Sequence, residues 1–174
     1  MPLDTGCLQV YTGNGKGKTT AAIGLGVRGA GGGLKVVMVQ FMKGRRYSEI
    51  EVIERMDNFE VYQHGRDEFV NREEPEQVDI RLAQGGLEHA AELIGGGAHD
   101  MVILDEINVA CDFGLIDKEE VMRIIRDRPP NMEVVLTGRY APEEFIEAAD
   151  LVTEMREVKH HYQRGVQARK GIEY

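Results

Sequence analysis

The sequence contains few cysteines and no long apolar run. Its two cysteines, Cys7 and Cys111, have neither the spacing of a metal site nor the number needed for a disulfide framework. Free buried thiols are therefore expected, which fits a reducing compartment. No apolar stretch approaches the length that spans a bilayer, and residues 1–5 lack the basic and apolar regions of a signal peptide. We expect a cytoplasmic protein that has no contact with a membrane.

Positive charge is also scarce. The 21 Lys and Arg residues are outnumbered by 30 Asp and Glu residues, so the net charge is −9. Because a nucleic-acid surface requires excess positive charge, this composition argues against a nucleic-acid partner and leaves room only for a local basic pocket. With 174 residues and 42% hydrophobic residues, the chain can bury the core of one domain. We predict a single domain over residues 1–174, in which residues 159–174 form an irregular basic tail.

A glycine-rich segment near the N-terminus is typical of a phosphate-binding loop. An apolar run precedes it at residues 7–11 and a helical pattern follows at residues 21–27. A strand, a turn and a helix start in this order present backbone N–H groups to an anion. A flexible basic turn without a ligand is the alternative, which the flanking elements disfavour. The predicted nucleotide contacts are Gly13, Asn14, Gly15, Lys16, Gly17, Lys18, Thr19 and Thr20.

Within this segment, Lys18 and Thr19 carry the predicted chemistry. Lys18 is placed to reach the terminal phosphates, and the Thr19 hydroxyl is placed to bind Mg²⁺. The strict pattern G-x-x-x-x-G-K-[ST] fails at one position, because Thr12 replaces its first glycine. Three glycines remain and Lys16 adds a second cation, so we predict that the segment binds ATP or a similar nucleotide.

Apolar runs alternate with helical patterns along the rest of the chain. The strands are expected at residues 7–11, 35–41, 59–64, 101–104, 133–137 and 151–155. Nearly continuous apolar runs are typical of parallel strands that are covered on both faces. The helical pattern at residues 76–94 contains Gly85 and Gly86, which mark either a kink or a close approach to the sheet. The sequence therefore predicts an α/β protein with a three-layer P-loop NTPase-like fold and a mostly parallel central sheet.

Polar side chains follow four of these strands. In a parallel sheet, residues 12–19, 40–43, 105–106 and 137–139 converge at the carboxyl edge, where ligands bind. Asp105 or Glu106 is predicted to be the magnesium-side carboxylate, and the sequence does not decide between them.

Several basic and aromatic residues allow both a functional and a purely structural interpretation. Arg139 is predicted to contact phosphate, with a surface ion pair as the alternative. For Lys43, Arg45 and Arg46, a solvated turn and a phosphate contact are equally compatible with the sequence. Tyr47, Phe69 and Tyr162 are candidates for contact with a flat ligand or for packing. These features together describe a magnesium-dependent ATP-binding domain, which a kinase, an ATPase or an adenosyltransferase would all satisfy.

Short stretches along nearly the whole chain are shared with one enzyme family. These stretches are residues 11–22 (YTGNGKGKTTAA), 40–44 (QFMKG), 104–108 (LDEIN), 135–142 (VLTGRYAP), 148–155 (AADLVTEM) and parts of 158–173. In them the chain resembles the P-loop-type ATP:corrinoid adenosyltransferases. The resemblance implies transfer of the 5′-deoxyadenosyl group of ATP to cobalt(I) of a corrinoid, with triphosphate as the leaving group. It also implies catalytic roles for Lys18, Glu106 and Arg139, a homodimer, and an electron-donor protein that reduces the corrinoid.

The chain departs from the family in the half of the site expected to face the corrinoid. Members usually carry a Phe-Thr-Trp stretch after the third strand, where this chain has residues 66–72 (RDEFVNR), and it contains no tryptophan. Phe69 or Tyr47 is a possible substitute. The departure leaves two other functions open: an ATP-binding regulatory protein, or an ATPase or phosphotransferase that forms ADP. The sequence also leaves open which corrinoid is the substrate.

Overall fold

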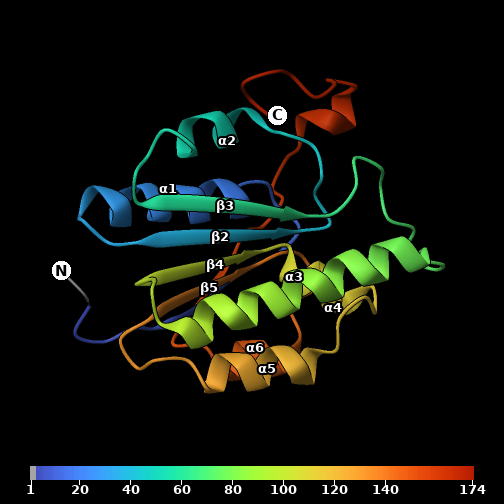
Figure 1. The fold of residues 1–174 in the computed structure, drawn as a ribbon. Helices are drawn as coiled ribbons and strands as arrows, with labels where there is room; N and C mark the ends of the chain where they lie inside the picture. Colours follow the sequence, from blue (N-terminus) through green and yellow to red (C-terminus); the bar gives the residue numbers. More distant parts are fainter. Residues whose placement is uncertain (1–2) are drawn as a thin grey trace.

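Six parallel strands form the centre of the molecule in a computed structural model that describes residues 3–174 (Figure 1). Their order across the sheet is β3-β2-β4-β5-β1-β6, and every neighbouring pair is parallel. The predicted α/β class and parallel sheet are confirmed; the first two residues of the predicted domain lie outside the described residues. The strands are β1 (Leu8–Thr12), β2 (Val36–Phe41), β3 (Phe59–His64), β4 (Met101–Asp105), β5 (Glu133–Thr137) and β6 (Leu151–Glu154).

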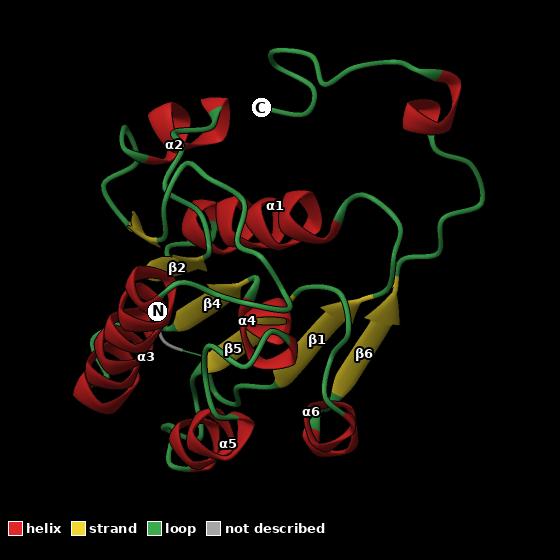
Figure 2. Ribbon diagram, turned by 90° about the vertical axis from the view of Figure 1, so that its right-hand side faces the viewer, coloured by secondary structure: helices red, strands yellow, loops and turns green. Residues whose placement is uncertain are grey.

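Helices cover both faces of this sheet and produce three layers (Figure 2). Helices α1 and α2 lie on one face, and α3, α5 and α6 lie on the other. Among residues 3–174, no helix is both long and apolar enough to cross a bilayer. The helices are α1 (Lys18–Gly31), α2 (Ser48–Ile53), α3 (Gln77–Gly96), α4 (Ile107–Asp112), α5 (Lys118–Arg126), α6 (Glu143–Ala148) and the 3₁₀ helix η1 (His161–Arg164).

The pattern of β2 explains why its sequence is apolar at nearly every position. Val36 and Met38 pack into the core on the α1 face, whereas Val37, Val39 and Phe41 pack into the core on the α3 face. Successive side chains of a strand point to opposite faces, so a strand covered on both sides needs apolar residues throughout. The hydrophobic effect therefore places β2 in the interior of the sheet.

Helix α3 is continuous through Gly85 and Gly86. Of the two expectations for this pair, a kink or a close approach to the sheet, the close approach is confirmed. A Cβ atom at Gly86 would lie 2.9 Å from the Phe41 ring and 2.9 Å from the His64 Cβ, whereas Gly85 has no such neighbour within 4 Å. Gly86 thus permits a close approach between α3 and the sheet. This contact brings α3 against the carboxyl ends of β2 and β3, beside the polar edge described next.

Candidate active site

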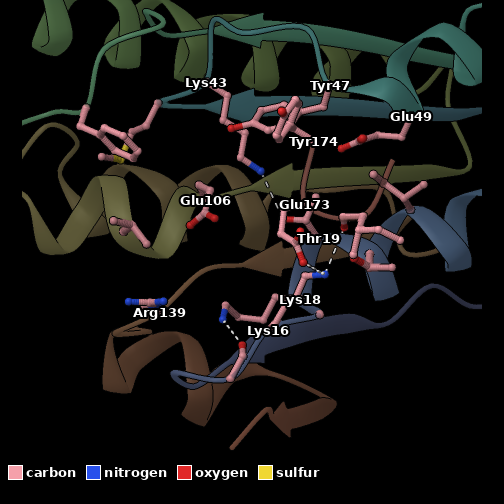
Figure 3. A pocket seen from close by; sticks show the side chains of 18 of the residues that line it. Lys16, Lys18, Thr19, Lys43, Tyr47, Glu49, Glu106, Arg139, Glu173 and Tyr174 are labelled. Atoms are coloured by element: carbon pink, nitrogen blue, oxygen red, sulfur yellow. Dashed lines mark hydrogen bonds and ion pairs between the residues drawn. The ribbon is translucent and has the colours of Figure 1, made fainter. Parts of the chain in front are cut away.

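The carboxyl ends of β1, β2, β4 and β5 surround a pocket of about 870 Å³ (Figure 3). The sheet order brings these strands together from distant parts of the sequence, so the predicted convergence of their polar residues is confirmed. Residues 15–20 of the glycine-rich segment line the pocket, whereas Gly13 and Asn14 do not. Opposite this segment, the pocket is bounded by residues that follow β2, including Lys43 and Tyr47.

The glycine-rich segment forms a tight turn against the chain that follows β6. Gly13 and Gly17 have φ angles of 92° and 118°, which side chains with a Cβ rarely adopt. The Gly15 N–H donates a hydrogen bond to the Met155 carbonyl at 2.6 Å. Thr12, which departs from the strict pattern, is the last residue of β1, and its Oγ1 accepts a hydrogen bond from the Ala141 N–H at 3.3 Å. The threonine therefore joins the turn to the segment after β5.

Lys18 lies at the start of α1 and folds back over this turn. Its Nζ donates hydrogen bonds to the carbonyls of Gly13 at 2.7 Å and Gly15 at 2.8 Å. Burial lowers the pKa of Lys18, and the positive charge of Arg139 acts in the same direction, against the attraction of Glu106. An anion in the pocket would favour the charged form of this lysine.

Asp105 is the centre of the polar network below the pocket. This fully buried carboxylate accepts hydrogen bonds from the hydroxyls of Thr19 at 2.8 Å and Thr137 at 2.7 Å, and from the Gln40 amide at 3.1 Å. Its fourth partner is the Lys43 ammonium at 2.7 Å. Burial opposes ionisation of Asp105, but the charge of Lys43 and these hydrogen bonds outweigh burial and lower its pKa. Asp105 is thus held as an anion.

Glu106 occupies a different position from its neighbour. It precedes α4 with φ 62°, in the left-handed region, and its backbone N–H donates to the Thr137 hydroxyl at 3.1 Å. This conformation directs the side chain into the pocket, between Lys43 and Arg139 (Figure 3). Burial raises the pKa of Glu106, and repulsion from Asp105 raises it further. The two consecutive carboxylates therefore separate: Asp105 contacts Thr19, and Glu106 faces the pocket.

The three basic residues after β2 have different environments. Lys43 is partly buried and forms an ion pair with Asp105. The Arg45 guanidinium lies 4.9 Å from the ring centroid of Tyr174, and Arg46 forms an ion pair with Glu54, the residue that follows α2. Arg139 lines the pocket and, within residues 3–174, forms no ion pair.

Aromatic residues line the outer part of the pocket. Tyr47 and Phe69 are among them, and the Phe69 side chain is fully exposed, whereas Tyr162 lies outside the pocket. Phe113 and Tyr174 also line the pocket, although no sequence motif marked them as site residues. The tail residue Tyr174 has no periodic pattern around it, so only its aromatic character could have drawn attention to it.

The irregular loop that carries Phe69 is attached to the rest of the protein on both sides. Before Phe69, Arg66 donates hydrogen bonds to both carboxylate oxygens of Asp79 on α3, each at 2.8 Å. After Phe69, Arg72 forms an ion pair with Asp112 on α4 at 3.0 Å. These two arginines hold the loop beside the pocket, which Phe69 and Arg72 line.

Comparison with known proteins identifies the family of the chain. A model of the ATP:corrinoid adenosyltransferase BtuR/CobO/CobP family matches residues 4–174. The chain belongs to this family.

Individual members match this adenosyltransferase chain over nearly its full length. The corrinoid adenosyltransferase of Pseudomonas aeruginosa is 40% identical over 172 residues, which cover 98% of this chain and 85% of the relative. The corrinoid adenosyltransferase of Escherichia coli K12 is 36% identical, and corrinoid adenosyltransferase CobA of Salmonella typhimurium is 34% identical. Each of these two alignments covers 98% of this chain and 87% of the relative. The resemblance drawn from the sequence is confirmed, and with it the transferase activity on ATP and a corrinoid.

Proposed function

We propose that this adenosyltransferase transfers the 5′-deoxyadenosyl group of ATP to cobalt(I) of a reduced corrinoid, with release of triphosphate, in the pocket described above. One observation carries the proposal. The phosphate loop with Lys16 and Lys18, the Arg139 guanidinium and a set of aromatic side chains line the same pocket. In this reaction the nucleophile belongs to the corrinoid, so the protein has to align C5′ with cobalt and to stabilise the leaving triphosphate.

The cations are suited to bind the triphosphate. Lys18 would exchange its hydrogen bonds to loop carbonyls for phosphate oxygens, and Lys16 would add charge beside it. Arg139, across the pocket, would contact the same group. As the C5′–O bond breaks, its electron pair stays on the triphosphate, and these cations stabilise the charge that accumulates there. Glu106, which faces the pocket, is suited to accept a hydrogen bond from the ribose.

Magnesium is the metal that this family fold implies, and the residues present fit it. The Thr19 hydroxyl and one Asp105 carboxylate oxygen lie 2.8 Å apart, and both are the hard oxygen ligands that Mg²⁺ prefers. Thr19 and Asp105 would hold the ion, with Glu106 next to them. When bound, magnesium supplies positive charge that offsets the charge of the triphosphate.

The part of the pocket that would face the corrinoid lacks the tryptophan that family members usually carry, because the chain contains none. We propose that Phe69 and Tyr47 provide the apolar contact with the corrin ring. Both line the pocket, and Phe69 extends from a loop that Arg66 and Arg72 attach to α3 and α4. A fully exposed phenylalanine at the edge of a binding pocket is a surface that a large apolar ligand would cover.

Assembly and location belong to the same proposal. We propose a cytoplasmic homodimer that receives electrons for its corrinoid from a separate donor protein. The two cysteines are free thiols, as expected in a reducing compartment. The edge strand β6 offers a surface for a second copy, because all four of its residues are exposed, Leu151 and Val152 among them. Light scattering at several protein concentrations tests the dimer.

The reaction itself tests the proposed function. Reduced corrinoid, ATP and Mg²⁺ should produce a light-sensitive alkylcobalt absorption spectrum and one equivalent of triphosphate. Lys18→Met should lower the rate roughly 100-fold or more, because it removes a charge from the leaving-group site. Lys35→Met is the matched control, since Lys35 is exposed before β2, at the opposite edge of the sheet. Formation of ADP in place of triphosphate would contradict the proposal.

A further inference from the structure

The residues after β6 return to the phosphate loop that forms one side of the pocket. After β6 the chain passes beside the loop, where the Met155 carbonyl accepts the Gly15 N–H, and it then turns through η1. Residues 171–174 come back to line the pocket together with Lys16 (Figure 3). We call residues 171–174 the terminal segment.

The terminal segment contacts both sides of the pocket. On the phosphate-loop side, the Lys16 ammonium donates to the Ile172 carbonyl at 3.1 Å and lies 3.4 Å from a Glu173 carboxylate oxygen. On the other side, the Tyr174 ring lies against the Arg45 guanidinium, and Figure 3 shows Tyr174 on the same side as Tyr47. The segment therefore joins the loop after β1 to the loop after β2.

Glu173 has partners that neutralise its charge. The backbone N–H of Arg169 donates to it at 2.8 Å and the Arg169 guanidinium at 3.1 Å, while His161 lies 3.4 Å away. Hydrogen bonds from Arg169 lower the pKa of Glu173 to about 2, so the carboxylate is ionised at neutral pH. Because Arg169 already balances this negative charge, the positive charge of Lys16 remains available to an anionic ligand.

The volume of the pocket decides whether the terminal segment obstructs a ligand or surrounds it. About 870 Å³ remains with the segment in place, which lies toward the upper end of the range for small-molecule sites. The Glu173 side chain is only 15% exposed, so it is part of the pocket wall. A ligand and the terminal segment can therefore occupy the pocket together.

We propose that the terminal segment is a wall of the ATP pocket and that Glu173 is a positioning residue, which holds Lys16 toward the triphosphate. This inference rests on the proposed function, in which triphosphate is the group that Lys16 binds. A free lysine side chain samples many rotamers, and binding an anion would immobilise it at an entropic cost. Contacts with Glu173 and the Ile172 carbonyl restrict Lys16 before the ligand arrives, so binding loses less entropy.

Calorimetric titration with inorganic tripolyphosphate and with ATP, both with Mg²⁺, tests the inference without a corrinoid or reductant. Glu173→Gln should weaken both affinities by about five- to tenfold, the cost of ordering one long side chain. In a Lys16→Met background the same substitution should have no further effect, because the two residues act through one contact. A chain that ends at residue 170 should reproduce the loss. Glu157→Gln, which removes a carboxylate that lies before the tail and outside the pocket, should bind like the wild type.

Three results would overturn the inference. Tighter binding by Glu173→Gln would mean that the carboxylate competes with the triphosphate. Unchanged binding would mean that Lys16 needs no positioning, and an equal loss in the Lys16→Met background would mean that Glu173 acts by another route. Failure of the proposed function looks different: tripolyphosphate would bind in a Glu173-dependent manner, but no alkylcobalt product would form with reduced corrinoid.

Discussion

Thr137 is the residue whose substitution tests the buried network most directly. Its hydroxyl donates to Asp105 at 2.7 Å and accepts from the Glu106 N–H at 3.1 Å, and the residue is fully buried. Thr137→Val replaces this hydroxyl with a methyl group of similar size. Asp105 then loses one of four donors, and the Glu106 N–H loses its acceptor at a position where the backbone has a positive φ angle.

The size of the effect follows from these two losses. An unsatisfied buried N–H costs about 1–3 kcal/mol, and a hydrogen bond to an ionised group contributes about 1.5–3 kcal/mol. The added methyl group recovers about 0.8 kcal/mol by burial. The three donors that remain keep Asp105 partly satisfied, so its own loss is at the low end of this range. We therefore expect Thr137→Val to lower the free energy of unfolding by roughly 2–4 kcal/mol.

Urea denaturation of the wild type and Thr137→Val at neutral pH measures this difference. Thr137→Ser is the matched control, since it keeps the hydroxyl and removes only a methyl group, and it should lose about 1 kcal/mol. The reasoning is refuted if Thr137→Val loses less than about 1 kcal/mol or if the serine variant is equally unstable.

Three further predictions concern other parts of the molecule. Gly86→Ala should destabilise the protein by about 1–3 kcal/mol through overlap with Phe41, whereas Gly85→Ala, with open space, should stabilise it by about 0.5–1 kcal/mol; equal effects in denaturation would contradict the packing argument. Burial, and then the charge of Asp117, raises the pKa of the Cys111 thiol to about 12 from 9.0, so alkylation by iodoacetamide at pH 8 should be about 1000-fold slower in the folded protein than in urea. Rapid labelling of folded Cys111 would refute this. Burial and a neighbouring histidine lower the pKa of His64 below its ordinary 6.5, so the unfolded state binds more protons and stability should fall as pH decreases through 6.5. This decrease should be smaller in His64→Gln, and an equal pH dependence would exclude His64 as its source.

The phosphate loop and the strands were predictable because their signals are local. Glycines followed by Lys18 and Thr19 specify a turn and a helix start within a few residues, and the continuous apolar run of β2 indicates a strand covered on both faces. The rule that ligands bind at the carboxyl edge of a parallel sheet then predicts which residues converge. The convergence of Thr19, Asp105 and Thr137 follows from this rule.

The different orientations of Asp105 and Glu106 were not predictable, because they depend on one backbone angle. Two consecutive acids after a strand look equivalent in sequence. The left-handed conformation of Glu106, supported by the Thr137 hydroxyl, directs one side chain to Thr19 and the other into the pocket. Such a conformation is determined by contacts with a strand 28 positions away or more, which no local pattern encodes.

The amino-acid sequence by itself determined the layered α/β fold, the phosphate loop and the family, since these depend on periodicity and on short contiguous motifs. Tertiary structure decided which side chains share the pocket. Lys43 proved to be the ion-pair partner of the buried Asp105, and Arg45 a partner of Tyr174. The return of Glu173 to Lys16 joins residues 157 positions apart. The physical reason is that ion pairs and aromatic contacts act over a few ångströms in space, so they appear only when the chain has folded.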